Sequence, residues 1–384
     1  MVNIKKEKDA LLKKADELEK KAESRLLTQR EIDLKQTVKD RLAHLLREEE
    51  VKWFQRAKTT KLLMGDRNTE YFHAVANGKR RKARIYRLEQ NEGVIEGEDD
   101  HKRYITNYYK GLFGPSKKNI FSMDESRTGD IPQVTDQENE RLTADFTEKD
   151  VRGAIFQMKH NKALELYGFP AEFNQVFWSL IKHDLMAMFK DFHKGNLPIF
   201  SLNFGIILLI PKMKEAKMIQ QYRPICMLNI SFKIFTKVLA NRLNIVVDKI
   251  IKPTQTAFMT GRYIMEGVVI LHETIHELKR EKQNGIILKL DFKKAYDKVN
   301  WEFLQQALRM KGFSQKWCKW IENIVTGGSV GVQINDEIGH FFQTKKILRQ
   351  GDPLPPILFN IVEDMLSILI TRATERERER ERAI

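Results

Sequence analysis

The sequence predicts an α+β fold, in which helices pack around a few short and very apolar strands. Apolar residues recur every three or four positions through most of the chain, as they do in amphipathic helices. Between these stretches, the runs Ile206–Pro211 and Ile286–Leu290 are largely apolar and of strand length. The 384 residues have room for about two or three domains and a sizeable core.

The charge and the cysteine content indicate which class of partner the protein binds and in which cellular compartment we expect it. The net charge is +15 and 31% of the residues are charged, which favours a polyanionic partner. Nucleic acid fits better than a membrane, because the longest apolar run, Ile206–Pro211, is far shorter than the ~20 residues of a spanning helix. Cys226 and Cys318 lack metal-ligand spacing, and the N-terminus lacks a signal-peptide pattern. We therefore expect an intracellular protein, nuclear or cytoplasmic and not secreted.

Residues 1–58 are expected to form a charged helical segment. Leu11 and Leu18 lie at helical spacing, and Thr28 with Glu31 has the pattern of a capping box that starts a second helix. Acidic and basic residues nearly balance, which is typical of a solvated helical hairpin or a loose coiled coil. Self-association through this segment is the partner-binding role left open.

Residues 59–113 are expected to connect this segment to the rest of the chain through a strongly basic stretch. Aromatic residues lie nearby, and bases that contact phosphates beside rings that stack are typical of nucleic-acid surfaces. A solvated basic loop or a nuclear-import cluster explains the same charges equally well. The six candidate contacts are Lys79, Arg80, Arg81, Lys82, Arg84 and Arg87.

Residues 114–143 are polar with few apolar positions, and we expect a linker or loose surface there. From residue 144 to residue 373 the pattern becomes regular. A long helix through Phe173 and Phe192 should stop at Gly195, and the strand Ile206–Pro211 precedes a helical stripe from Phe232 to Val246. Later, Trp317 to Ile324 predicts a helix, and two strands, Ser329–Ile334 and His340–Ile347, should form a hairpin.

The helix after Arg262 contains a pattern typical of zinc proteases. His272 and His276 match H-E-x-x-H, in which two histidines one turn apart bind zinc. Both lie at the margin of the apolar stripe that runs from Ile264 to Leu278, and Lys279 stands where metzincins have a glycine. We therefore favour an ordinary core helix over a zinc site.

The stretch from Ile286 to Trp301 carries the strongest candidate site. A strand through Leu290 would deliver Asp291 to its C-terminal end, where open sheets hold their chemistry and a carboxylate can hold a metal. From Asp297, which is placed to cap a first turn, the spacing turns helical through Trp301 and Leu308.

These residues resemble motif A of reverse transcriptases, in the form found in plant-type non-LTR (LINE-like) retrotransposons. The resemblance implies that Asp291 binds the catalytic magnesium ions beside the backbone carbonyl of Phe292. It also implies that Tyr296 is the steric gate, whose ring occupies the place of a ribonucleotide's 2′-hydroxyl.

Arg349-Gln350-Gly351-Asp352-Pro353 predicts a helix start, with Asp352 as N-cap and Pro353 at the first helical position. The same residues resemble motif B of LINE-like reverse transcriptases. By that resemblance, Gln350 and Gly351 line the nucleotide and template site, and Arg349 lies with the nucleotide-binding residues. Glycine there would allow close backbone approach.

Further segments resemble the fingers of the same enzymes. In the stretch from Ile206 to Ile225, the resemblance places Arg223 on the incoming triphosphate, for which a guanidinium fork is suited, and makes Lys212 a weaker candidate. Surface charge explains Lys212 equally well. Arg262, at the end of T-A-F-M-T-G-R, is implied to contact template or nucleotide.

The resemblance covers roughly residues 55–373 and implies the fingers and partial palm of a right-hand polymerase, the reverse-transcriptase fold. Its activity would be RNA-directed DNA synthesis, with an RNA template, a DNA primer and deoxynucleotide triphosphates as partners. Yet Asp-Asp occurs only at Asp99-Asp100, upstream, and residues 374–384 are a Glu-Arg repeat, expected to be disordered or a helical extension. Residues 162–169 also depart from the family's Pro-Gly turn.

A two-metal mechanism needs carboxylates from more than one strand, so we expect weak or absent Mg²⁺ binding and no activity from this chain alone. A non-catalytic nucleic-acid binder of the same fold is the main alternative. A group II intron maturase is the runner-up among enzymes.

Overall fold

The computed structural model describes residues 2–57, 74–78, 84–90, 93–115, 122–159, 170–284, 286–287, 289–292, 294–335 and 337–383. The chain divides into two compact units. The first comprises residues 1–84 with 161–163, and the second comprises residues 85–160 with 164–384.

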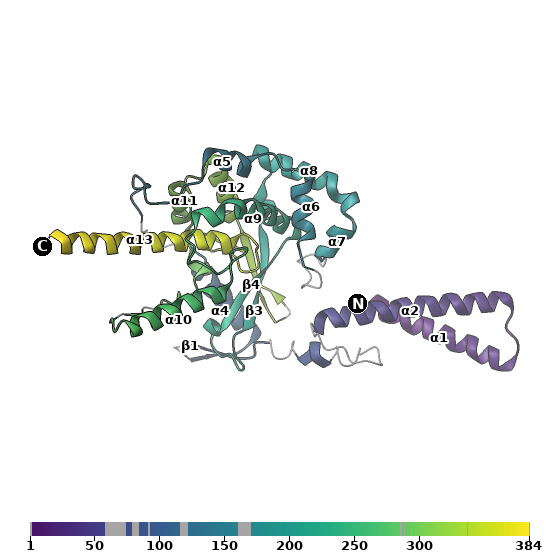
Figure 1. Ribbon diagram of the computed structural model, residues 1–384. Helices are drawn as coiled ribbons and strands as arrows, with labels where there is room; N and C mark the ends of the chain where they lie inside the picture. The colour runs from purple at the N-terminus through teal and green to yellow at the C-terminus, as the bar shows by residue number, and fades with distance from the viewer. Residues whose placement is uncertain are drawn as a thin grey trace. The chain divides into compact units, whose positions relative to one another are not determined.

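The first unit contains two antiparallel helices, α1 (Val2–Ser24) and α2 (Gln29–Ala57) (Figure 1). Leu18, Val38 and Leu45 are buried between them. Salt bridges also join the two helices, including Lys8 Nζ to Glu49 Oε2 at 2.8 Å. The predicted pair of helices is therefore present, with a narrow apolar seam and a charged exterior.

The second unit is built on one mixed sheet whose strands are ordered β4-β3-β5-β6, with β7 also paired to β5. β3 pairs antiparallel with β4 and parallel with β5, whereas β6 and β7 pair antiparallel with β5. A separate small sheet joins β1 to β2. The strands are β1 (Leu88–Gln90), β2 (Gly93–Ile95), β3 (Phe204–Pro211), β4 (Tyr222–Leu228), β5 (Ser329–Ile334), β6 (Glu337–Ile338) and β7 (Phe342–Gln343).

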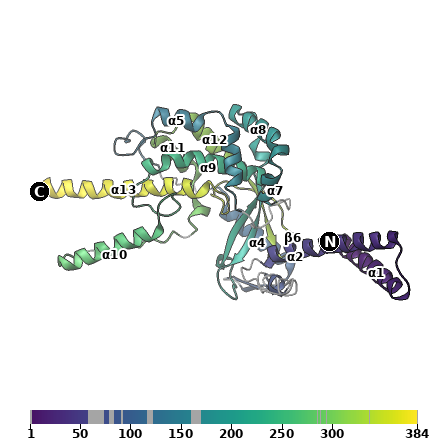
Figure 2. The same ribbon diagram turned by 45° about the vertical axis from the view of Figure 1, so that its right-hand side comes forward.

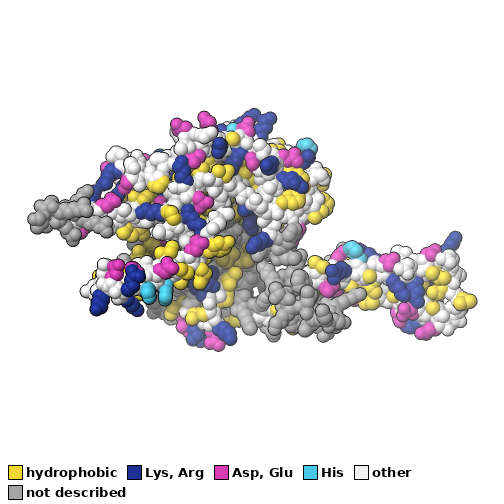
Figure 3. Space-filling model, in the orientation of Figure 1, with side chains coloured by type: hydrophobic (Ala, Val, Ile, Leu, Met, Phe, Trp, Pro, Cys, Tyr) yellow, Lys and Arg dark blue, Asp and Glu magenta, His cyan; other side chains and the backbone are white. Residues whose placement is uncertain are grey.

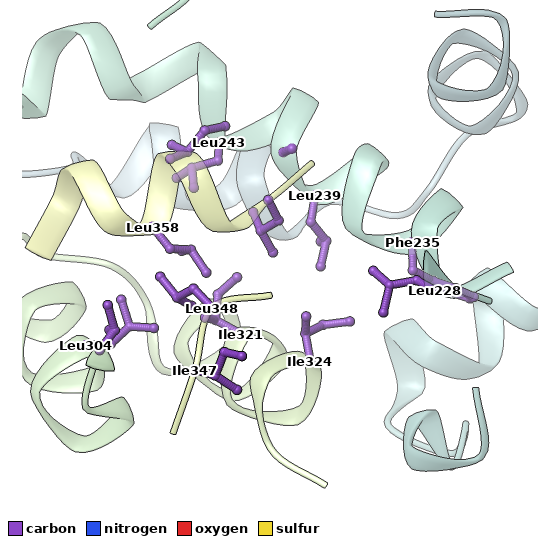
Figure 4. Packing of buried hydrophobic residues seen from close by; sticks show 14 of the residues in the cluster. Leu228, Phe235, Leu239, Leu243, Leu304, Ile321, Ile324, Ile347, Leu348 and Leu358 are labelled. Atoms are coloured by element: carbon purple, nitrogen blue, oxygen red, sulfur yellow. The ribbon is translucent and has the colours of Figure 1, made fainter. Parts of the chain in front are cut away.

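Helices from distant parts of the sequence enclose the core of this unit. The close view in Figure 4 shows leucines and isoleucines of α9, α11, α12 and α13 meeting beside Ile347 and Leu348, all of them buried. The helices are α4 (Glu98–Leu112), α5 (Asp136–Thr143), α6 (Glu148–Phe156), α7 (Ala171–Val176), α8 (Trp178–Lys194), α9 (Ile230–Ile250), α10 (Ile264–Arg280), α11 (Trp301–Met310), α12 (Gln315–Val325) and α13 (Pro355–Ala383), with short 3₁₀ turns η1 (Ile199–Ser201), η2 (Ile219–Gln221) and η3 (Tyr296–Lys298).

The end of α8 is the one that the sequence predicts. Gly195 adopts φ 78°, a left-handed conformation that suits glycine, and it closes the helix. The predicted long helix is interrupted near its start, since α7 ends at Val176 and α8 begins at Trp178.

Residues 122–143 are not the loose surface that their polarity suggests. Ile131 and Val134 are buried, and Thr135 caps α5 through a capping box with Glu138. A few apolar anchors and backbone bonds such as Val134 N–H to Lys311 O, 2.9 Å, are enough to fix a polar segment to the core.

α10 is a helix as predicted, but its apolar stripe is not part of the core. None of its residues is buried, and Ile264, Val268 and Leu271 are each about half exposed or more. Figures 1 and 2 show α10 extending away from the sheet, and Figure 3 shows hydrophobic and histidine side chains at its surface. The pattern identifies the apolar face of a helix but cannot say whether another element covers it.

In the described part of the chain, no helix is long and apolar enough to cross a membrane.

Candidate active site

The Gln350–Gly351 turn is fixed against strand β4. It is a four-residue turn from Arg349 to Asp352, closed by Asp352 N–H to Arg349 O at 3.4 Å. Cys226 N–H of β4 donates to Gln350 O at 2.9 Å. Gly351 has φ +112°, and a Cβ atom there would lie 2.7 Å from the Cys226 carbonyl oxygen. Glycine is therefore required at Gly351 both for the backbone conformation and for the close approach to β4.

Tyr296 lies beside this turn, although the two are distant in sequence. Leu348 N–H donates to Tyr296 O at 2.8 Å. Trp301 Nε1–H donates to Ile347 O at 3.1 Å, a second link between the same segments. The Tyr296 ring stacks on Phe359 of α13, with centroids 4.9 Å apart. The structure thus brings two of the groups singled out in the sequence, the candidate gate Tyr296 and the Gln350–Gly351 turn, onto adjacent segments.

Asp291 does not end a strand, which corrects the prediction for Ile286–Leu290. The described residues among 286–292 have no regular structure and belong to none of the described sheet pairings. A strand needs a neighbour for its backbone N–H and C=O groups, and apolar character alone cannot supply one. Ile286 is 98% exposed and Phe292 47% exposed, and Asp291 is exposed as well. The metal-binding roles of Asp291 and Phe292 stay predictions.

Asp297 is buried and does not cap the following helix. Asn300 caps α11 instead, with its side chain accepting from Glu302 N–H at 2.7 Å and from the next amide. Asp297 is 1% exposed, and its Oδ1 has no hydrogen-bond partner among the described residues. Burial raises the pKa of Asp297 to about 6, opposed by the positive charges of Lys294 and Lys212. A buried carboxyl beside the candidate gate was missed because its helical spacing suggested a cap.

Lys212 and Arg223 lie at the same end of the β3–β4 ladder, where Ile210 pairs with Arg223. Arg223 is exposed. Lys212 is also exposed, and its Nζ donates to Gln220 O at 3.0 Å. Its positive charge lowers the pKa of the Asp297 carboxyl. The structure therefore places Lys212 near the turn that carries Tyr296. Triphosphate binding by either residue stays a prediction.

Two other predicted nucleotide contacts are largely engaged within the protein. Arg262 donates to four backbone carbonyls, including Lys252 O and Gln255 O at 2.8 Å each. Arg349 is 7% exposed, and its guanidinium lies over the Phe232 ring, 4.7 Å from the centroid. Binding of template or nucleotide would compete with these internal contacts.

The start of the last helix also differs in detail from the prediction. α13 begins at Pro355, so Pro353 is not its first residue. Asp352 Oδ1 accepts from Leu354 N–H at 3.2 Å, within the turn that precedes the helix. The side chain therefore stabilises the local turn without being the N-cap of the helix.

Part of the predicted basic surface lies outside the described residues. This holds for Lys79, Arg80, Arg81 and Lys82, and also for the altered turn at 162–169. Arg84 and Arg87 are described and exposed.

The described residues do not form a metal site. Across the described ranges, no group of three or more His, Cys, Asp or Glu side chains could hold a metal ion. His272 and His276 lie on the exposed helix α10. Since Asp291 is exposed and no described carboxylate joins it in such a group, this donor set does not fit the magnesium pair of a polymerase.

Comparison with known sequences finds a family match over the part of the chain that contains the candidate site. Residues 210–377, which span β4, the Tyr296 segment and the Gln350–Gly351 turn, match the family described as Reverse transcriptase (RNA-dependent DNA polymerase). The second unit therefore contains a region similar to a reverse transcriptase domain. Its mixture of helices and a sheet agrees with the α+β fold class that the sequence predicts.

Similar proteins come from transposable elements. The Transposon TX1 uncharacterized 149 kDa protein of Xenopus laevis is 28% identical over 324 residues, which are 84% of this chain and 25% of that protein. The Retrovirus-related Pol polyprotein from type-2 retrotransposable element R2DM of Drosophila melanogaster is 26% identical over 241 residues, 63% of this chain and 22% of that protein. The chain is thus similar to proteins of a transposon and of a retrotransposable element, and it spans a quarter or less of the length of these relatives.

Proposed function

We propose that the second unit is the fingers and part of the palm of an RNA-directed DNA polymerase from a plant-type non-LTR retrotransposon. The observation that carries the proposal is the Leu348 N–H to Tyr296 O bond of 2.8 Å, which holds the gate tyrosine beside the Gln350–Gly351 turn within the matched family region. In the proposed reaction, the 3′-hydroxyl of a DNA primer attacks the α-phosphate of a deoxynucleotide paired to an RNA template.

Each described group has a part in this proposal. Gln350 and Gly351 face the nascent base pair, and the Tyr296 ring excludes a 2′-hydroxyl. Arg223, exposed at the end of the β3–β4 ladder, binds the triphosphate with its planar fork. The family's chemistry implies Mg²⁺, but the described residues do not form a site for it, so we assign no step to a metal.

We further propose that these 384 residues do not extend a primer on their own. The support is the position of Asp291, which lies exposed in an unpaired segment with no described carboxylate cluster around it. Primer extension on an RNA template with Mg²⁺ checks this. Product that disappears in Asp291→Asn would contradict it.

Template-directed nucleotide binding tests the polymerase proposal without requiring turnover. A fluorescent RNA template annealed to a DNA primer should bind the chain, with affinity that falls steeply with salt because of the net charge of +15. The deoxynucleotide complementary to the first unpaired template base should strengthen this binding in the presence of Mg²⁺ or Ca²⁺. The other three should have no effect.

Two variants sharpen the experiment. Arg223→Gln should abolish the effect of the complementary nucleotide, whereas Arg141→Gln, at an exposed arginine of α5 outside the candidate site, should leave it unchanged. Four deoxynucleotides acting equally, or none acting, would refute the polymerase proposal.

A non-catalytic nucleic-acid binder is the second candidate, favoured by the exposed position of Asp291. It predicts salt-dependent binding of the template–primer, unchanged by Asp291→Asn and indifferent to the nucleotide added. Self-association through residues 1–58 and an intracellular location stay predictions, and sedimentation of the full chain at several concentrations checks the first.

A further inference from the structure

The turn that carries Gln350 and Gly351 has buried ends and a more open middle. Arg349 is 7% exposed and Asp352 6% exposed, whereas Gly351 is exposed and Gln350 partly so. The two residues implied to meet the substrate are therefore flanked by two charged residues that the solvent barely reaches.

Arg349 packs on Phe232 of α9 and lies close to Gly328, just before β5. Its guanidinium packs over the Phe232 ring at 4.7 Å. A Cβ atom on Gly328 would lie 3.3 Å from Arg349 Nη1 and 3.2 Å from Asn203 Oδ1, so the absence of a side chain at Gly328 leaves room for the guanidinium. This burial leaves little of the group free to meet a triphosphate.

Asp352 completes the arrangement from the other end of the turn. Its Oδ1 accepts from Leu354 N–H at 3.2 Å, and Arg349 is the strongest positive charge acting on its carboxylate. Thr236 and Lys233 of α9 also favour the charged form, while burial opposes it and raises the pKa of the group. The opposite charges of Arg349 and Asp352 thus lie at the two ends of the turn, and both are close to residues of α9.

We propose that Arg349 and Asp352 are positioning residues, which lock both ends of the turn onto α9 so that Gln350 and Gly351 stay fixed beside Tyr296. This differs from the nucleotide contact that the resemblance implied for Arg349. The benefit of a fixed turn for nucleotide binding rests on the proposed polymerase function, but the positioning of the turn by Arg349 and Asp352 is a property of the free protein. Losing it should loosen the turn while the rest of the unit stays folded.

Amide hydrogen exchange on the full 384-residue chain tests the lock directly. The reporters are Cys226 N–H, bonded to Gln350 O, and Asp352 N–H, which closes the turn. The amides of α12 serve as the internal reference for any general loss of stability. In Arg349→Met, exchange at both reporters should be at least about tenfold faster than in the wild type, after division by the change in exchange rate of the α12 amides. Arg349→Lys should show a smaller change in the same direction, because it keeps the charge without the planar group on Phe232.

The matched control is Arg372→Met. Arg372 is also 7% exposed, and it is ion-paired with Asp130, but it lies in the second half of α13. Its loss should leave the two reporters unchanged relative to α12. Asp352→Asn, which keeps an acceptor for Leu354 N–H, provides a second variant if Arg349→Met fails to fold, and it should also speed exchange at Cys226.

Unchanged exchange at both reporters in Arg349→Met and Asp352→Asn would overturn the proposal. So would an increase no larger than that in α12. A chain that shows no template-directed nucleotide effect would defeat the proposed function, yet the exchange result would still decide whether the lock exists.

Discussion

Asp297→Asn is expected to stabilise the second unit above pH 6. The native carboxyl is 1% exposed, and burial raises its pKa from 3.8 to about 6. In the unfolded chain it would ionise near pH 4. The folded state therefore binds more protons between roughly pH 4 and pH 6, and stability falls as the pH rises through that window. The difference of roughly two pKa units corresponds to about 3 kcal/mol lost above pH 6.

An asparagine carries no charge but still has polar atoms to satisfy, so only part of this cost should be recovered. We expect about 2 kcal/mol of added stability at pH 8 and none at pH 4. Urea unfolding at several pH values, followed by the fluorescence of the buried Trp317 and Trp320, measures it. Asp184→Asn, at an exposed aspartate of α8, is the control.

The nearby Lys212 provides a second test of the predicted pKa of Asp297. Lys212 lowers the pKa of Asp297, so Lys212→Met should raise that pKa further and move the pH window upward. Identical pH profiles for the wild type and Asp297→Asn would refute the assignment of a buried, destabilising charge to this residue.

Two further predictions concern the scaffold. Lys311→Met should cost about 3–5 kcal/mol in urea unfolding, because Lys311 and Asp364 form a buried salt bridge of 2.7 Å and the carboxylate would lose its partner. Replacing Asp364 by leucine as well should recover much of the loss, and no recovery would contradict the explanation. Gly351→Ala should cost more than about 1 kcal/mol, because its Cβ would meet the Cys226 carbonyl at 2.7 Å. Gly111→Ala, with nothing within 4 Å, should be neutral or stabilising in the same urea-unfolding assay.

Features set by nearby residues could be predicted from the sequence. The left-handed Gly195 closes α8, and the apolar run through Ile207 is the central strand β3. The spacing of Trp317 and Ile324 gives a helix whose apolar face is buried. In each case the signal and its structural consequence lie within one element, so neighbouring parts of the fold do not need to be known.

Features that depend on a distant partner could not be predicted in this way. The run Ile286–Leu290 has strand composition, but a strand forms only where another strand accepts it. The resemblance places Arg349 among the nucleotide-binding residues, because the sequence does not show that its guanidinium will lie over the ring of Phe232. The proximity of Tyr296 and the Gln350–Gly351 turn came from resemblance, because no local pattern encodes a contact between segments so far apart.

Photo-crosslinking tests most directly whether Tyr296 and the Gln350–Gly351 turn form a nucleotide site. An RNA template carrying 4-thiouridine at the first unpaired position is annealed to a DNA primer and irradiated with the chain, with and without dATP. We expect crosslinks to the peptides that contain Gln350 or Phe258, whose ring contacts the Tyr296 ring. These crosslinks should increase with dATP but not with dCTP. Crosslinks confined to residues 1–57, or unaffected by dATP, would contradict it.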